Sequence, residues 1–136
     1  SEYLPTVRHA VTPSGTGCPG SQGVPQINAA NAPILGTTKF RLSVSPTPAS
    51  ATVLFAISGA PAALSLPGGC SLYVQSPFIA TPATASSGGI ATLHLTIPNV
   101  ASLRGATLEV QGLVVDPGGS FAGLSFTGGL QLLLGD

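Results

Sequence analysis

Few residues in this chain could carry out acid–base, nucleophilic or metal chemistry. Among 136 residues there are two histidines, four acidic residues and two cysteines. A nucleophilic triad needs a histidine beside a serine or cysteine, with a carboxylate behind the histidine. His9 falls in an extended N-terminal segment and His94 on the polar face of an expected strand, so we expect both to be surface side chains. The sequence therefore predicts no triad.

The acidic residues form no recognisable pair or cluster. Glycoside hydrolysis needs two carboxylates around the scissile bond, and calcium sites need clustered oxygen ligands. The four acidic residues are Glu2, Glu109, Asp116 and Asp136, and two of them, Glu2 and Asp136, lie near the ends of the sequence. Asp116 and Asn99 are isolated. Asp116 is better explained by the turn signal DPGG, in which Gly118 or Gly119 is expected to take a positive φ. We therefore expect no enzyme activity, no metal and no cofactor.

The two cysteines, Cys18 and Cys70, predict one disulfide. A small, even number of cysteines in a Lys-poor, Gly- and Thr-rich chain is typical of proteins from oxidising compartments. Two unrelated buried thiols are the alternative. A metal site is disfavoured, because neither cysteine has another Cys or His at ligand spacing. The chain also contains no Met and begins at Ser1, which predicts that a signal peptide has been removed.

The composition argues against several classes of partner. Only 6% of the residues are charged, against about 25% in average proteins, and the formal net charge is zero. Nucleic acids and anionic lipids need clustered Lys or Arg, so neither is expected. No apolar run reaches the roughly 18 residues that span a bilayer, so we expect no membrane insertion. A surface with so few charges is expected to contact glycans or other copies of the chain.

The elements that position these residues are predicted to be β-strands. Residues 90–97 alternate between apolar and polar, and residues 107–115 repeat the pattern until Gly112 interrupts it. We interpret these two segments as a hairpin-like pair. Further strands are expected at residues 24–28, 37–44, 51–57, 70–75, 121–126 and 130–134, with a brief one at 78–79. The last two full strands would point the same set of apolar side chains inward: Leu124, Phe126, Leu130, Leu132 and Leu134.

About eight short strands, with 18 glycines and 13 prolines between them, predict an all-β fold. Two antiparallel sheets packed as a jelly-roll-like β-sandwich account for that number. We expect residues 15–136 to form this single domain. Residues 1–14 are expected to be an extended N-terminal arm and its joint.

The N-terminal arm is the segment that the sandwich does not explain. Residues 1–11 are extended in character, and residues 12–23 are nearly all turn formers. We expect the arm to contact a neighbouring copy through its apolar residues, Tyr3, Leu4, Val7 and Val11. Since residues 113–115 are apolar on both faces, Leu113 and Val115 are the expected acceptor. The alternatives are an arm that folds back onto its own domain and a disordered leader.

Hydroxyl residues beside prolines are candidate sites of O-glycosylation. Ser45, Thr47, Thr81 and Thr84 lie in such segments. The alternative is that these segments are plain solvated loops. No Asn-X-Ser/Thr sequon is present.

Several short motifs resemble one known module. They are GCPG at 17–20, GCSLYV at 69–74, IPN at 97–99 and DPGG at 116–119. Together they resemble a β-sandwich module found at the C-termini of uncharacterised secreted proteins of environmental bacteria, over residues 15–135. The resemblance implies that Cys18 pairs with Cys70 and that the chain is secreted, at the bacterial cell surface or in its environment. It implies no catalytic residues.

The sequence therefore favours a structural role. An exported domain without chemistry, with an arm outside its core, predicts the subunit of a self-assembling extracellular fibre. In such a fibre the arm of one copy adds a strand to the next copy, head to tail. The alternative is a carbohydrate-binding or adhesion module, which the scarcity of exposed aromatic residues disfavours.

Overall fold

The computed structural model describes residues 7–136, which form an all-β domain. It has ten strands, and two 3-10 turns at Pro67–Gly69 and Ala101–Leu103 are the helical elements of this part of the chain. The strands are β1 (Ala10–Ser14), β2 (Gln26–Ala30), β3 (Phe40–Ser45), β4 (Thr52–Ser58), β5 (Pro61–Ser65), β6 (Ser71–Val74), β7 (Ile79–Thr84), β8 (Ala91–Leu95), β9 (Thr107–Val115) and β10 (Leu124–Leu133).

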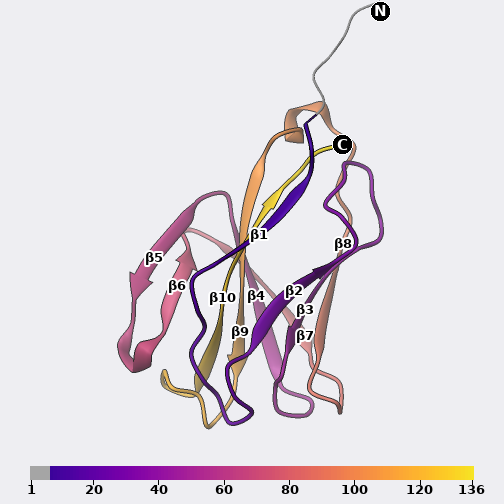
Figure 1. Cartoon of the computed structure of the whole chain (residues 1–136). Helices are drawn as coiled ribbons and strands as arrows, with labels where there is room; N and C mark the ends of the chain where they lie inside the picture. Colours follow the sequence, from indigo (N-terminus) through magenta and orange to yellow (C-terminus); the bar gives the residue numbers. More distant parts are fainter. Residues whose placement is uncertain (1–6) are drawn as a thin grey trace, which may run out of the picture.

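The strands form two facing sheets and one hairpin (Figure 1). The larger sheet has the order β1-β10-β9-β4-β7, the smaller has the order β2-β3-β8, and β5 pairs with β6 alone. All strand pairs are antiparallel. The predicted two-sheet antiparallel sandwich is confirmed. The expected hairpin of residues 90–97 and 107–115 is wrong, because β8 and β9 belong to different sheets.

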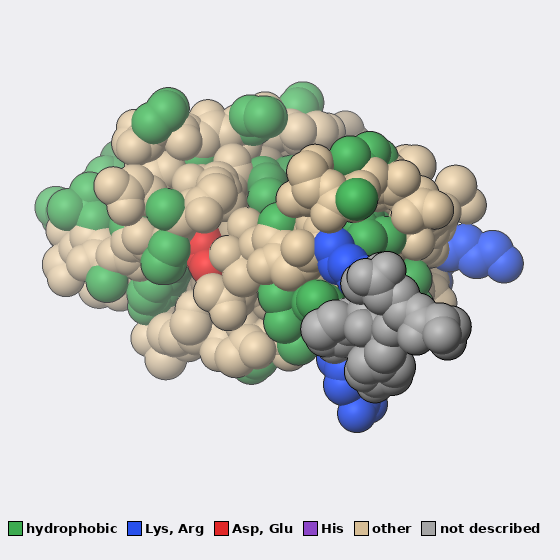
Figure 2. Space-filling view, turned by 90° about the horizontal axis from the view of Figure 1, so that it is seen from above, with side chains coloured by type: hydrophobic (Ala, Val, Ile, Leu, Met, Phe, Trp, Pro, Cys, Tyr) green, Lys and Arg blue, Asp and Glu red, His purple; other side chains and the backbone are tan. Residues whose placement is uncertain are grey.

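The surface carries few charges. Figure 2 shows a face that is mostly apolar or uncharged, with Lys and Arg side chains toward one side and an acidic side chain apart from them. In residues 7–136 no helix has the length and apolar character needed to cross a membrane.

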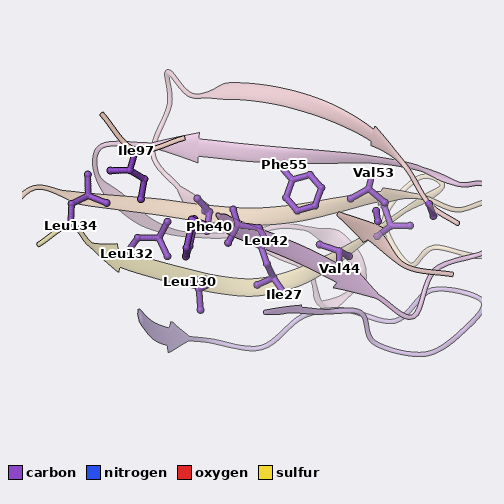
Figure 3. Close-up of a cluster of buried hydrophobic side chains, with 14 residues drawn as sticks. Ile27, Phe40, Leu42, Val44, Val53, Phe55, Ile97, Leu130, Leu132 and Leu134 are labelled. Atoms are coloured by element: carbon purple, nitrogen blue, oxygen red, sulfur yellow. The ribbon is translucent and has the colours of Figure 1, made fainter. Parts of the chain in front are cut away.

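The main core lies between the two sheets. Apolar side chains alternate along β3 and β4, so Phe40, Leu42 and Val44 meet Val53 and Phe55 across the sandwich (Figure 3). β9 and β10 contribute to the same cluster through Val110, Val114, Leu130 and Leu132. Side chains at every second position of β3 and β4 therefore face this core.

Gly112 does not interrupt β9, which runs without a break from Thr107 to Val115. Its position faces the core, where a Cβ would lie 2.6 Å from Cγ2 of Val44. Its N–H donates to Thr127 Oγ1 at 2.9 Å. Gly112 is therefore required by the close approach of the two sheets.

A second apolar cluster lies on the opposite face of the larger sheet. It contains the Cys18–Cys70 disulfide, Leu113 and Phe126, with Leu72 of the β5–β6 hairpin packed beside them. The hairpin thus helps to cover the outer face of β9, which explains why residues 113–115 are apolar on both faces. The predicted disulfide is confirmed. β5 is a strand that the sequence pattern did not indicate, and the η1 turn connects it to Cys70.

The prediction that residues 121–134 form two strands with their apolar side chains on the same side is wrong. β10 is one long strand whose register against β9 shifts between Phe126 and Gly129. The shift places Phe126 in the second cluster and Leu130 in the main core. An extra residue reverses the alternation of side chains, which is why one strand supplies both clusters.

The turn at residues 116–119 forms, but its glycines do not have the predicted conformation. Gly119 N donates to Asp116 O at 2.8 Å, as a β-turn requires. Positive φ occurs instead at Ala122 (49°) and Gly123 (81°), immediately before β10. The prediction for Gly118 and Gly119 is wrong, because two turns follow one another here and the positive φ occurs in the second, which leads into β10.

Candidate assembly site

β1 occupies one edge of the larger sheet, where it pairs with β10 of the same chain (Figure 1). The register sets Val11 opposite Leu132 and Ser14 opposite Gly129. All five residues of β1 are exposed, and Val11, its largest apolar side chain, is 36% accessible. β1 is therefore held mainly by backbone pairing, and it adds almost nothing to either core.

Val7 and His9, just before β1, are attached to Asp136. Its carboxylate accepts hydrogen bonds from Val7 N at 3.0 Å and from Arg104 Nε at 3.1 Å, and it forms an ion pair with Arg104. Its amide donates to Val7 O at 2.6 Å, and His9 Nδ1 donates to its main-chain oxygen at 2.7 Å. We call Val7, His9, Arg104 and Asp136 the Asp136 cluster. The Arg104 hydrogen bonds, followed by that from Val7, lower the pKa of Asp136, so the carboxylate is ionised at neutral pH.

A short hinge, residues 15–17, joins β1 to the body of the domain. Gly15 has φ of 65°, which favours glycine, and a Cβ there would overlap the Tyr73 ring. The Tyr73 hydroxyl accepts from Thr16 N at 3.1 Å and donates to Thr16 O at 3.0 Å. Tyr73 therefore fixes the hinge.

The chain is anchored to the body from Cys18 onward. Cys18 N donates to Phe126 O at 2.9 Å, and its side chain is bonded to Cys70. The turn-forming residues 12–23 are therefore divided between two parts of the structure. Residues 12–14 belong to β1, and residues 18–23 are fixed to the domain.

Asp116 supplies a further anchor just after the disulfide. Its carboxylate is 1% accessible and accepts from Ser21 N (2.8 Å), Ser21 Oγ (3.0 Å) and Gly118 N (2.8 Å). Burial raises the pKa of Asp116, but these three hydrogen bonds together outweigh burial and lower it below its usual value. The ionised carboxylate thus ties Ser21 to the turn between β9 and β10.

Replacing Asp116 by asparagine is expected to lower the free energy of unfolding by about 2 kcal/mol at pH 7, because hydrogen bonds to an ionised group are lost. A carboxyl whose pKa is lowered by folding stabilises fully above its unfolded pKa of about 3.9, and this stabilisation is lost as the pH falls through the folded pKa. Urea unfolding of both proteins between pH 7 and pH 2 should show the difference shrinking below about pH 4. Pro117→Ala, at an exposed neighbour, is the control. A difference that stays constant with pH would contradict this role.

The expected acceptor, Leu113 and Val115, is not an open edge. β9 is paired with β10 on one side and with β4 on the other. Leu113 is 8% accessible and lies in the second cluster, whereas Val115 is 45% accessible at the end of the strand. No strand can therefore add to β9, and the edge that carries β1 belongs to β10. Of the predicted arm residues, Val7 and Val11 lie beside this edge, and Tyr3 and Leu4 fall outside the described residues.

The predicted glycosylation positions differ in accessibility. Thr47 is 4% accessible and its hydroxyl donates to Pro48 O, so it is not available in the folded domain. Ser45 and Thr81 are half-buried within β3 and β7. Thr84 is exposed at the end of β7.

The histidines lie in separate parts of the described chain. His9, just before β1, and His94, in β8 of the smaller sheet, are both exposed. Within residues 7–136, no three His, Cys, Asp or Glu side chains are grouped so as to hold a metal ion.

Comparisons with protein-family models, curated proteins and solved structures found no match. The resemblance to the module of secreted bacterial proteins stays a prediction. The site must therefore be interpreted from its own geometry.

The Asp136 cluster and the Tyr73 contact are the parts that sequence reasoning missed. Arg104 and Asp136 are 32 positions apart, and Val7 and Asp136 are 129 apart. Neither separation leaves a local pattern. The available signal was the small number of charged residues. A charged side chain that packs against an apolar surface loses contact with water and therefore needs a partner.

Proposed function

We propose that the protein is a non-enzymatic, extracellular structural subunit that polymerises head to tail by exchanging β1. In the polymer, β1 of one copy leaves its own β10 and pairs with β10 of the next copy. The observation that carries this proposal is that β1 is wholly exposed and that residues 15–17 join it to the part of the chain anchored by the disulfide.

The closed and exchanged forms contain the same strand pairing, so their free energies differ little. Each backbone hydrogen bond contributes roughly 0.5–1.5 kcal/mol net, and Pro13 lacks an N–H to donate. A strand that buries no side chain belongs to the least stable part of a fold and opens most readily. The balance between the two forms then depends on protein concentration.

The geometry of donor and acceptor favours an open chain of subunits. The donor, β1, and the acceptor, the edge of β10, are different surfaces of one copy, so the contact is heterologous and can repeat indefinitely. Three hinge residues reach at most about 10 Å. Neighbouring domains would therefore abut, and the fibre would be stiff.

Two features support an extracellular location. The disulfide buried beneath the hairpin is typical of proteins from oxidising compartments. The nearly uncharged surface suits packing against other copies. Thr84 is the best remaining candidate for a glycan, since it is exposed at an outer strand of the larger sheet.

A cysteine cross-link between two variants tests the exchange. Thr12 and Gln131 are opposite one another in the β1–β10 register. Copies carrying Thr12→Cys are mixed with copies carrying Gln131→Cys, left to assemble at high concentration, and oxidised. We expect a dimer band on non-reducing gels whose linking peptide joins positions 12 and 131.

The matched control pairs Thr12→Cys with Ser87→Cys, at an exposed turn, and should give no such peptide. Deleting residues 1–14 from the chain should abolish the multimers. Two results would show that β1 exchange does not join the subunits. One is multimers that survive this deletion, and the other is oxidised multimers of the two cysteine variants in which no peptide links positions 12 and 131.

A further inference from the structure

The smaller sheet carries a polar depression of about 320 Å³ that plays no part in β1 exchange. It is lined by Asn31, Thr38, Lys39, Arg41 and His94. Phe40 and Leu42 point into the core, so Arg41 lies on the outward face of β3. The depression therefore faces solvent on the sheet opposite to the one that holds β1 and β10.

Strand register brings these side chains together. Arg41 of β3 lies opposite His94 of β8 on one side and opposite Ala30, the end of β2, on the other. Asn31 follows Ala30 with φ of 67°, and its Nδ2 donates to Lys39 O at 2.7 Å. This hydrogen bond joins the two ends of the loop from β2 to β3, which fixes the walls of the depression before any ligand arrives.

The charge in the depression is unbalanced. Lys39 and Arg41 are two of the four Lys and Arg residues in the chain. The three acidic side chains of residues 7–136 are engaged elsewhere: Glu109 with Gln131, Asp116 with Ser21 and Gly118, and Asp136 with Arg104. In a chain with so few charges, two cations beside a histidine mark a place for an external anion.

We propose that this depression binds the carboxylate or sulfate group of an acidic saccharide. The Arg41 guanidinium can donate two parallel hydrogen bonds to such a group, and Lys39 adds a second charge. Asn31, Thr38 and His94 can exchange hydrogen bonds with sugar hydroxyls. The volume is at the lower end of the range for small-molecule sites and accommodates more than a bare oxyanion.

The same features disfavour other polyanions. Single-stranded nucleic acids are held by aromatic side chains on which bases stack, and the lining contains no Phe, Tyr or Trp. Anionic membranes attract clusters of roughly four to eight basic residues, whereas the depression has two. The saccharide site lies away from the β10 edge, so each subunit of a fibre would keep it open, and repeated sites would bind a long polysaccharide by avidity.

Calorimetric titration of the full chain at low concentration tests the proposal. The probes are an oligogalacturonate, a sulfated dextran oligomer, the neutral dextran oligomer and inorganic sulfate. We expect one site per chain for a carboxylated or sulfated probe, no binding of neutral dextran, and weaker binding of inorganic sulfate. The two acidic probes distinguish carboxylate from sulfate recognition.

Arg41→Gln is expected to weaken saccharide binding at least about tenfold, since hydrogen bonds to an ionised group are lost. Arg8→Gln, which removes an exposed arginine from beside β1, is the matched control and should bind normally. Thermal unfolding of both variants should match the parent, because both side chains are exposed. Equal binding of neutral dextran, equal binding of inorganic sulfate, or unchanged binding by Arg41→Gln would overturn the proposal. None of these outcomes depends on whether the subunits polymerise.

Discussion

Replacing Cys18 and Cys70 together by alanine is expected to lower the free energy of unfolding by about 4 kcal/mol. The bond joins residues 52 positions apart, so its loss returns the entropy of a long loop to the unfolded chain. Both side chains are also about 99% buried, within the second cluster. The effect is a large fraction of the roughly 5–15 kcal/mol that stabilises a typical domain. Urea unfolding monitored by circular dichroism measures it.

Loss of the disulfide should change the structure only around the second cluster. The main core contains neither cysteine, so amide exchange in β3 and β4 should change only with global stability. Amides of the β5–β6 hairpin and of residues 18–23 should exchange faster than the rest. Reducing the native protein under mild conditions should reproduce the effect of the double substitution. A loss below about 1 kcal/mol would mean that the second cluster holds the hairpin without the disulfide.

Gln111→Leu is expected to cost about 3 kcal/mol, although it keeps the size of the side chain. Gln111 is fully buried on the outer face of β9. Its Nε2 donates to Ser71 O and Thr127 O, both at 2.8 Å, and its Oε1 accepts from Tyr73 N at 2.8 Å. Leucine would leave one N–H and two carbonyls buried without partners, and each such group costs roughly 1–3 kcal/mol before relaxation.

This substitution has a matched control in Gln26→Leu, on the exposed face of β2. The control should change stability by less than about 0.5 kcal/mol, as surface substitutions usually do. Because Gln111 links β6 to the body, its loss should also increase protease cleavage within residues 61–75. Stability unchanged in Gln111→Leu would contradict the view that this amide attaches the hairpin to the sheet.

The strands that were predicted well are those with strict alternation and flanking turn formers. β9 matches the expected residues 107–115, and β3 and β4 lie within one to three residues of the expected bounds. Their inward side chains are determined locally, since the side chains that face the main core repeat every second residue. β5 was missed because Pro61–Ser65 is largely exposed and has no such alternation.

The arrangement of strands was harder to predict than their positions. Residues 90–97 and 107–115 are near in sequence and similar in pattern, yet a connection through the 3-10 turn at Ala101–Leu103 carries the chain from one sheet to the other. The acceptor at Leu113 and Val115 was wrong for a related reason. A strand that is apolar on both faces is covered on both faces, and here the β5–β6 hairpin of the same chain covers the outer one.

The candidate assembly site was only partly visible in the sequence. The arm was identified by its composition, but its partner, the β10 edge, is set by pairings across more than 100 positions. The hinge is defined by Tyr73 and Cys18, which meet it only in the folded chain. The polar depression with Lys39 and Arg41 was not predicted, because Arg41 and His94 lie in two strands, and Asn31 follows a third, that the sequence does not place side by side.

The register shift in β10 bears on how uniform the polymer would be. Phe126 is set into one apolar cluster and Leu130 into the other, on opposite faces of the same strand. Sliding β10 by any number of residues would pull side chains out of both clusters at once. Each copy therefore presents its edge at one fixed position relative to the whole domain. A chain of such copies would have identical steps, and the sequence of a single strand would set the axial repeat of the entire fibre.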